Sequence, residues 1–394
     1  MPLTRQDKID IFREMVLMRK FEERAQEMYE ARHIGGFLHL YIGQEAVASG
    51  FTWPIEPRDY IIGAYREHGQ ALARCAEPRR IMAELYGKRD GMSGGKGGSM
   101  HLFSKERRFL GGTAIVGGGL PIALGVGFAI DYREEDAICL CFFGDGAINE
   151  GAFHESMNLA SLWSLPILFI CENNRYGMGT AVERASAVAN LFRRAQCYGM
   201  EVETVDGMDV LSVVEMAERC VNAVRRDRRP IFVEAVTYRY RGHSIADPGH
   251  YRTKEEMDLW RQHDSLIGYR DYLLANGHAS DAELDAINEH EPTMSGNVEL
   301  DVQVGSNVVA VPSSHFSERP QHPRRSVHEP VPVGVLPYVL QQAHNSVSRP
   351  ELLARGLPRE HNPTRHSKPT RRARPGPRSP TVRRERLSRS QPLR

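Results

Sequence analysis

The chain has 394 residues, of which 41% are hydrophobic and 26% charged, with 51 Lys and Arg against 50 Asp and Glu. This length allows one large domain or two ordinary ones, each with a sizeable core. No apolar run is long enough to span a bilayer, and no apolar segment follows a basic one near the start, which excludes the usual patterns of membrane spans and signal peptides. We therefore expect a soluble, cytoplasmic protein.

The near-neutral charge hides a division of the chain into two parts. Residues 293–394 hold 17 Lys and Arg, 7 Asp and Glu and 14 of the 23 prolines, whereas residues 1–292 hold 34 basic and 43 acidic residues. A Pro-rich segment with high net charge is typical of chains that do not fold. We expect a folded domain over 1–290 and a basic, Pro/Arg-rich tail over 291–394, which is either disordered or the product of a shifted reading frame.

The first predicted element is a long amphipathic helix over residues 5–31. Its apolar residues recur at helical spacing, and the segment contains neither Gly nor Pro. Gly35-Gly36 is expected to end it. The apolar positions are Ile9, Phe12, Val16, Met18, Phe21 and Met28.

A glycine-rich segment, GGTAIVGGGLPIALGVGFAID, covers residues 111–131. Pro121 suits the first turn of a helix that begins near Leu120. Two interpretations stay open from the sequence. The segment is either a tightly packed core helix, or its glycine loop lies beside a cofactor.

Three apolar runs have the length of strands: 137–143 (AICLCFF), 167–172 (ILFICE) and 231–236 (IFVEAV). Helical patterns lie between them, near 150–162 and 209–227. Strands that are apolar on both faces and alternate with helices predict an α/β fold, in which helices cover both faces of a parallel sheet.

Polar residues follow two of these runs directly. Gly144-Asp145-Gly146 comes after the first run, and Asn173-Asn174 comes after the second. Ligands of open α/β sheets bind at the carboxyl ends of the strands. Because Mg²⁺ prefers carboxylate and amide oxygens and takes its other ligands from phosphates and water, Asp145 and Asn174 predict a site for a metal-bridged diphosphate.

The six cysteines show no CxxC spacing and fall mostly in apolar runs, which predicts buried thiols rather than metal ligands or disulfides. They are Cys75, Cys139, Cys141, Cys171, Cys197 and Cys220.

The GDG triplet, 26 intervening residues and the NN pair resemble the signature of thiamine diphosphate enzymes. Five further blocks, in the expected order, resemble the alpha subunits of the E1 component of pyruvate dehydrogenase complexes over roughly residues 5–290. They are HLYIGQEA (39–46), AYREHG (64–69), GGKGGSMHLF (94–103), ENNRYGMGTAVERA (172–185) and YRYRGHSIADPGHYRT (238–253).

The resemblance implies a thiamine diphosphate-binding fold and assigns roles to single residues. Asp145, Asn174 and the carbonyl of Tyr176 would hold Mg²⁺. Thiamine diphosphate would contact Tyr65, Arg66, Ile115, Val116, Gly144, Asp145, Gly146, Ala147, Asn174, Tyr176 and His243. Arg66 would face the diphosphate, since a planar guanidinium suits phosphate oxygens. His243 and His39 would be the catalytic histidines, with His39 lining the substrate end of the channel.

The resemblance also implies a reaction and partners. The alpha subunit would act in the oxidative decarboxylation of pyruvate, a small 2-oxo acid, with transfer of the acetyl group to the lipoyl domain of E2. A glutamate needed to activate the cofactor belongs to the beta subunit of an α₂β₂ assembly, so we expect the isolated chain to be inactive. An acetoin or branched-chain 2-oxo acid dehydrogenase subunit is the alternative. A nucleic-acid-binding role for the basic tail is the rival from another class, and the body of the chain offers no motif for it.

Two departures from the family pattern bear on substrate choice. Gly117-Gly118-Gly119 and Ala114 differ from the residues expected beside the cofactor cleft.

Ser244 matches a position that is phosphorylated in mitochondrial relatives, and a phosphate there would place negative charge beside the cofactor loop.

Overall fold

The structure, a computed structural model, describes residues 2–75 and 77–290. The predicted tail over 291–394, and with it the choice between disorder and a shifted frame, lies outside these residues. The domain boundary at 290 stays a prediction. Within the described part of the chain, no helix is long and apolar enough to cross a membrane.

Twelve α-helices and two 3₁₀ turns are present in the described residues. The helices are α1 (Arg5–Glu30), α2 (Glu45–Thr52), α3 (His68–Cys75), α4 (Pro78–Leu85), α5 (Gly119–Tyr132), α6 (Gly151–Leu162), α7 (Val182–Ala185), α8 (Phe192–Gln196), α9 (Val210–Asp227), α10 (Lys254–Arg261), α11 (Ser265–Ala275) and α12 (Asp281–His290), and the turns are η1 (Gly98–Met100) and η2 (Asp145–Asn149).

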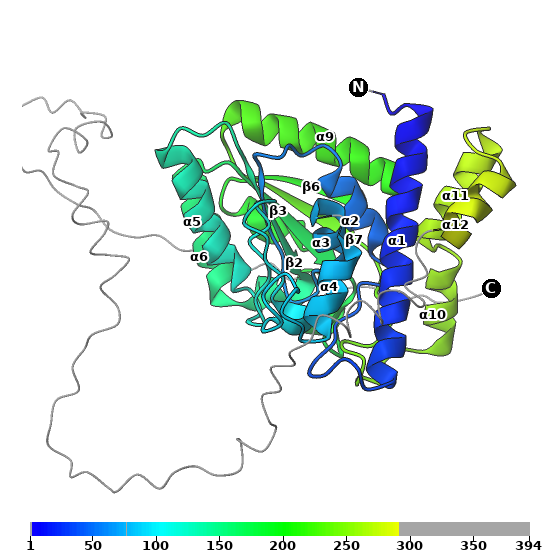
Figure 1. The fold of residues 1–394 in the computed structure, drawn as a ribbon. Coiled ribbons are helices and arrows are strands. Elements are labelled where there is room, and N and C mark those ends of the chain that lie inside the picture. The colour runs from blue at the N-terminus through cyan, green and yellow to red at the C-terminus, as the bar shows by residue number, and fades with distance from the viewer. Residues whose placement is uncertain (1, 76, 291–394) are drawn as a thin grey trace, which may run out of the picture. The chain divides into compact units, whose positions relative to one another are not determined.

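The described strands form a five-stranded parallel sheet and a separate two-stranded antiparallel pair (Figure 1). In spatial order the sheet contains β1 (Tyr60–Ile62), β2 (Cys139–Gly144), β3 (Ile167–Asn173), β7 (Ile231–Val236) and β6 (Glu201–Asp206), and the pair is β4 (Tyr176–Gly177) with β5 (Thr180–Ala181). The predicted parallel sheet with helices on both faces is confirmed. β2, β3 and β7 are the three predicted strands, while the edge strands β1 and β6 were not predicted.

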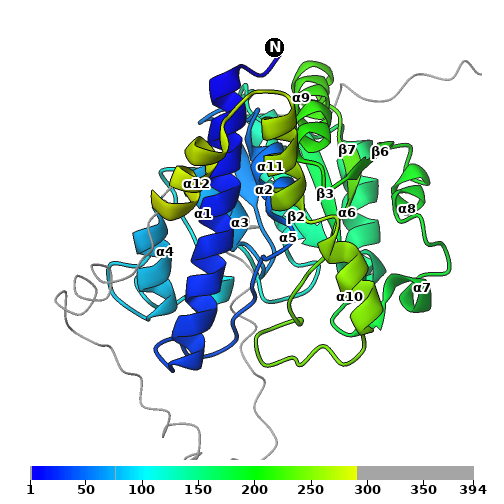
Figure 2. The same ribbon diagram turned by 90° about the vertical axis from the view of Figure 1, so that its right-hand side faces the viewer.

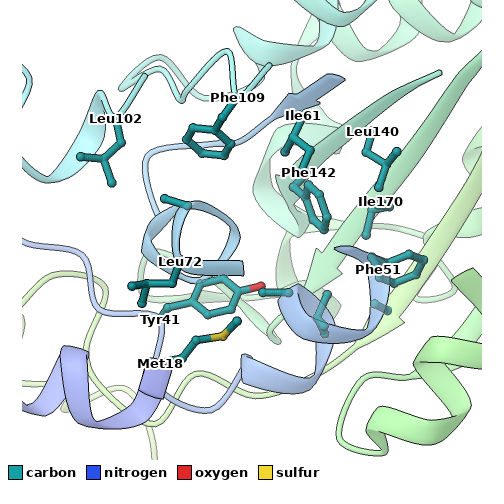
Figure 3. Packing of buried hydrophobic residues seen from close by; sticks show 14 of the residues in the cluster. Met18, Tyr41, Phe51, Ile61, Leu72, Leu102, Phe109, Leu140, Phe142 and Ile170 are labelled. Carbon is teal, nitrogen blue, oxygen red and sulfur yellow. The ribbon is translucent and has the colours of Figure 1, made fainter. Parts of the chain in front are cut away.

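Side chains of the central strands alternate between two cores, as the strand repeat of two requires. Leu140 and Phe142 of β2 pack with α1–α4 and α9 on one face, whereas Cys141 and Phe143 pack with α5 and α6 on the other. Figure 3 shows Phe142 and Ile170 of the sheet beside Phe51 of α2 in the first of these cores. The long apolar runs of β2 and β3 follow from this burial on both faces.

The helix α1 confirms the long N-terminal helix, although it ends at Glu30, before Gly35-Gly36. Thr4 caps its start, and the Thr4 hydroxyl and the Asp7 carboxylate each accept a backbone N–H of the other residue. Its N-terminal half packs in a third core together with α11 and α12, which lie beside it in Figure 2.

The helix α5 is buried on one face only, so the interpretation of residues 111–131 as a tightly packed core helix is wrong for the other face. Apolar side chains of α5 and of the end of α6 are exposed there, and we call these residues the apolar face. They are Ile122, Phe128, Tyr132, Leu162 and Trp163. Within this set the ring of Phe128 stacks on Tyr132 and contacts Trp163, and exposed aromatic side chains in contact indicate a surface that another molecule covers.

Four of the predicted buried thiols are buried, those of Cys139, Cys141, Cys171 and Cys220. The prediction is wrong for Cys197, which is exposed. This residue follows the short helix α8 at the surface, whereas the other four lie in β2, β3 and α9. The side chain of Cys75 lies outside the described part of the chain.

The carboxyl group of Glu67 is fully buried and lies close to the backbone of Gly63 and Gly112. Its Oε1 atom accepts the N–H of Leu102 at 2.7 Å, while Oε2 is buried without a partner. Burial raises the pKa of the Glu67 carboxyl well above 4.5, so the folded protein keeps this proton to a higher pH than the unfolded chain does.

The raised pKa of Glu67 predicts a pH-dependent stability. Above pH 4.5 the unfolded chain releases the proton that the folded protein keeps, so the free energy of unfolding should fall by up to about 1.4 kcal/mol per pH unit as the pH rises. Glu67→Gln removes this dependence and should stabilise the protein more at pH 8 than at pH 5.5. Urea unfolding at both pH values measures the difference, and two parallel pH curves would contradict a raised pKa of Glu67.

Candidate active site

A pocket with about 620 Å³ of empty space, part of it open to solvent, lies at the carboxyl ends of β2 and β3. Ten of the predicted site residues line it: Tyr65, Arg66, Ile115, Val116, Gly144, Asp145, Gly146, Ala147, Asn174 and Tyr176. The structure therefore brings together residues that lie up to 111 positions apart in the chain.

The register of the sheet places Asp145 beside the two asparagines. Gly144 at the end of β2 pairs with Glu172 of β3, so the residues that follow each strand emerge next to each other. The two asparagines then point to different partners. Asn173 donates to the buried Glu234 carboxylate at 2.7 Å, while Asn174 lines the pocket.

The orientation of the Asn174 amide follows from its neighbours. Arg239 Nη1 lies 3.3 Å from Asn174 Oδ1, and a guanidinium can only donate, so the oxygen of Asn174 faces Arg239. The Asn174 Nδ2 atom donates to Gln44 Oε1 at 2.9 Å. Gln44 thus holds the nitrogen and keeps the oxygen turned toward the guanidinium cation, in the way that residues behind a metal ligand commonly orient the ligand.

Asp145 is the one carboxylate among the three predicted metal ligands. It is buried, and this burial raises its pKa to about 6, while the positive charge of Arg239 acts in the opposite direction. A carboxylate in such a position gains from a divalent cation, which would stabilise its ionised form.

Two buried guanidinium groups, those of Arg66 and Arg239, line the same pocket. Arg66 donates to the carbonyls of Leu40 and His243, both at 2.5 Å. Within the described residues neither arginine forms an ion pair, and burial together with the charge of Arg239 lowers the pKa of Arg66 to about 10. A pocket with two such cations is suited to a multiply charged anion.

The two predicted catalytic histidines lie against Tyr65 of the pocket wall. The ring centroids of His39 and Tyr65 are 4.9 Å apart, those of His39 and His243 are 5.1 Å apart, and those of Tyr65 and His243 are 5.6 Å apart. Burial and the charge of Arg66 lower the pKa of His39 to about 3 and that of His243 to about 4. Both rings are neutral near pH 7, and the Nδ1 atom of each is buried and has no hydrogen-bond partner among the residues that the structure describes.

Ile115 and Val116 form part of the pocket lip, with 73% and 42% of their surface exposed. Ile115 and Val116 are therefore not part of the hydrophobic core. Gly117, the next residue, also lines the pocket and adopts a φ of 74°, which favours glycine. The glycine loop lies in the pocket wall, as one of the two interpretations of this segment expected.

Sequence reasoning missed three polar residues of the site, namely Gln44, Glu172 and Arg239. Glu172 lines the pocket and accepts hydrogen bonds from the hydroxyl of Tyr41 and the amide of Gln70. Its burial raises its pKa to about 7. All three residues belong to the quoted sequence blocks, but no spacing in the sequence separates a buried Glu, Gln or Arg from a solvated one.

The comparisons with known proteins agree with this geometry. The Dehydrogenase E1 component family matches residues 13–294. The alpha subunit of the pyruvate dehydrogenase E1 component from Rhizobium meliloti is 46% identical over 287 residues, which cover 73% of this chain and 82% of that protein. The corresponding subunits from Zymomonas mobilis and Rickettsia prowazekii are 45% and 42% identical, over 72% of this chain and 81% and 87% of theirs. The chain therefore belongs to the Dehydrogenase E1 component family.

Proposed function

We propose that this chain is the alpha subunit of the E1 component of a pyruvate dehydrogenase complex. In this role it binds thiamine diphosphate and Mg²⁺ and takes part in the oxidative decarboxylation of pyruvate. The observation that carries the proposal is the pocket in which a buried carboxylate and amide lie beside two buried arginines that form no ion pair with residues 2–75 or 77–290. The first pair suits a divalent cation, and the second pair suits a diphosphate.

The residues of the pocket fit both groups. Asp145, Asn174 and the carbonyl oxygen of Tyr176 are three oxygen donors on one wall, and Mg²⁺ commonly takes a few protein oxygens and completes its shell with phosphate and water. Gly144 and Gly146 present no side chain that would keep a ligand from the backbone. In both cases a Cβ at this position would meet no atom closer than 3.6 Å.

Because His39 and His243 are neutral, they can serve as hydrogen-bonding groups in the reaction. When bound, thiamine diphosphate supplies the nucleophilic carbon and the ring that accepts the electrons released with CO₂. His39 and His243, held neutral by burial and by Arg66, can donate or accept single hydrogen bonds at the substrate end without adding charge. Their two buried Nδ1 atoms are free for this purpose.

A second chain is part of the proposal. In this family a glutamate of the beta subunit activates the cofactor, so the functional unit is an α₂β₂ heterotetramer that delivers the acetyl group to the lipoyl domain of E2, in the cytoplasm. The apolar face of α5 and α6 supports a partner chain, since large apolar side chains of a soluble subunit are rarely left exposed together. Ile115 and Val116 are further exposed apolar side chains and line the pocket.

Reconstitution tests the proposed function. The purified chain alone should show no decarboxylation, while the chain combined with a beta subunit, thiamine diphosphate and Mg²⁺ should turn over pyruvate, measured by reduction of an artificial electron acceptor. 2-Oxoisovalerate and acetoin serve as the competing substrates. Robust turnover by the chain alone would contradict the dependence on a beta subunit, and a preference for either competitor would assign the chain to the corresponding dehydrogenase instead.

A further inference from the structure

Arg239 occupies an unusual place for a buried arginine. Its side chain is 2% exposed, and its Nη1 atom lies 3.3 Å from Asn174 Oδ1 and 3.1 Å from the carbonyl oxygen of Tyr176. These two atoms are the oxygens that, together with the Asp145 carboxylate, would bind the divalent cation. One nitrogen of the guanidinium therefore contacts both of these oxygens.

The remaining contacts of Arg239 are made to neutral acceptors. Nη2 donates to the Met178 carbonyl and to the Tyr251 hydroxyl, both at 2.9 Å, and Nε donates to the Arg241 carbonyl at 3.2 Å. No carboxylate pairs with Arg239 in the described part of the chain. A charge held by neutral acceptors loses little when it exchanges them for an anion, because a charge-assisted bond is stronger than a bond to a neutral group.

From these contacts, and resting on the proposed function, we propose that Arg239 and the divalent cation compete for the same two oxygens. Binding of the metal with the diphosphate would move the guanidinium off Asn174 and Tyr176 and onto the phosphate oxygens. Electrostatics favours this exchange, because two cations repel each other when both contact the oxygens of Asn174 and Tyr176. The phosphate oxygens in turn offer the guanidinium a negative partner. Before the metal binds, Arg239 would keep the oxygens of Asn174 and Tyr176 oriented.

This competition makes opposite predictions for the metal and the diphosphate. Arg239→Gln removes the competing cation, so the affinity for Mn²⁺ alone should rise about tenfold. The same change removes a phosphate contact, so the affinity for thiamine diphosphate should fall about tenfold or more. Arg66→Gln is the matched control. It removes the other buried arginine of the pocket, which donates to Leu40 and His243 rather than to the metal oxygens, so it should weaken diphosphate binding and leave the affinity for Mn²⁺ alone unchanged.

The experiment measures Mn²⁺ binding by electron paramagnetic resonance and thiamine diphosphate binding by fluorescence quenching, on the full chain assembled with its beta subunit. Circular dichroism checks the fold, and Arg239→Met replaces Arg239→Gln if the glutamine variant does not fold. An unchanged or weaker Mn²⁺ affinity in the Arg239 variant overturns the competition, and so does an equal gain in Arg66→Gln, which would show a general effect of charge. Failure of the unsubstituted protein to bind thiamine diphosphate with Mn²⁺ would instead overturn the proposed function.

Discussion

Asp145→Asn is expected to lower the affinity of the assembled enzyme for Mg²⁺ and thiamine diphosphate by at least 100-fold. Asp145 is the one carboxylate among the three oxygens that face the proposed metal, and it is buried. The amide keeps the shape of the side chain but removes its charge, and inside a protein a unit charge at contact distance contributes several kcal/mol. Calorimetric titration with Mg²⁺ at saturating thiamine diphosphate measures the loss.

Glu150→Gln is the control for this experiment. Glu150 is exposed and directly precedes α6, five residues after Asp145, and its side chain makes no capping hydrogen bond to the helix. Its substitution therefore removes one negative charge from the same region without touching the proposed ligands. We expect its effect to stay within about threefold, because exposed charges are screened by solvent. A similar loss in both variants, or a loss below tenfold in Asp145→Asn, would show that Asp145 does not bind the metal.

Glu84→Ala is expected to produce the second large effect, on stability. Glu84, at the end of α4, is fully buried and accepts four backbone N–H groups from the loop that follows. Oε2 accepts those of Ser93 and Gly95 at 2.7 and 2.8 Å, and Oε1 accepts those of Gly97 and Gly98 at 2.6 and 3.1 Å. A buried donor without an acceptor costs about 1–3 kcal/mol, and since part of the loop can open to water, we expect a total loss of about 4 kcal/mol.

The loss of these four hydrogen bonds should also affect the candidate active site. The loop leads into Ser99, whose hydroxyl contacts His68 Nε2 at 3.0 Å and accepts the N–H of His39 at 3.2 Å. Glu84→Gln is the graded control, because its amide keeps one acceptor oxygen and should lose about half as much stability. Urea unfolding at pH 7 measures both variants. A loss below about 1 kcal/mol for Glu84→Ala would show that the loop holds its shape without the carboxylate.

The strands illustrate how far the sequence carries the fold. β7 spans Ile231–Val236, as predicted, because a strand buried on both faces consists almost entirely of apolar residues, and in β7 the buried Glu234 is the one exception. β1 has only three residues, too few for a pattern, and β6 lies at the sheet edge, where its Glu and Asp side chains reach solvent. Neither edge strand carries the signal that identifies a central one.

The candidate site, like the fold, could be predicted from the sequence only in part. The sequence by itself determined that Asp145 and Asn174 each follow a predicted strand, and a parallel sheet must then bring both to one edge. That the two strands pair directly is a finding of the structure. Only the tertiary structure decided that Ile115 and Val116 are exposed at the pocket lip, and that Arg239 lies buried across the oxygens of Asn174 and Tyr176. The reason is physical. The burial of a strand is visible in its own pattern of apolar and polar residues. The environment of a single arginine or valine on a loop is instead formed by segments that are far away in the sequence.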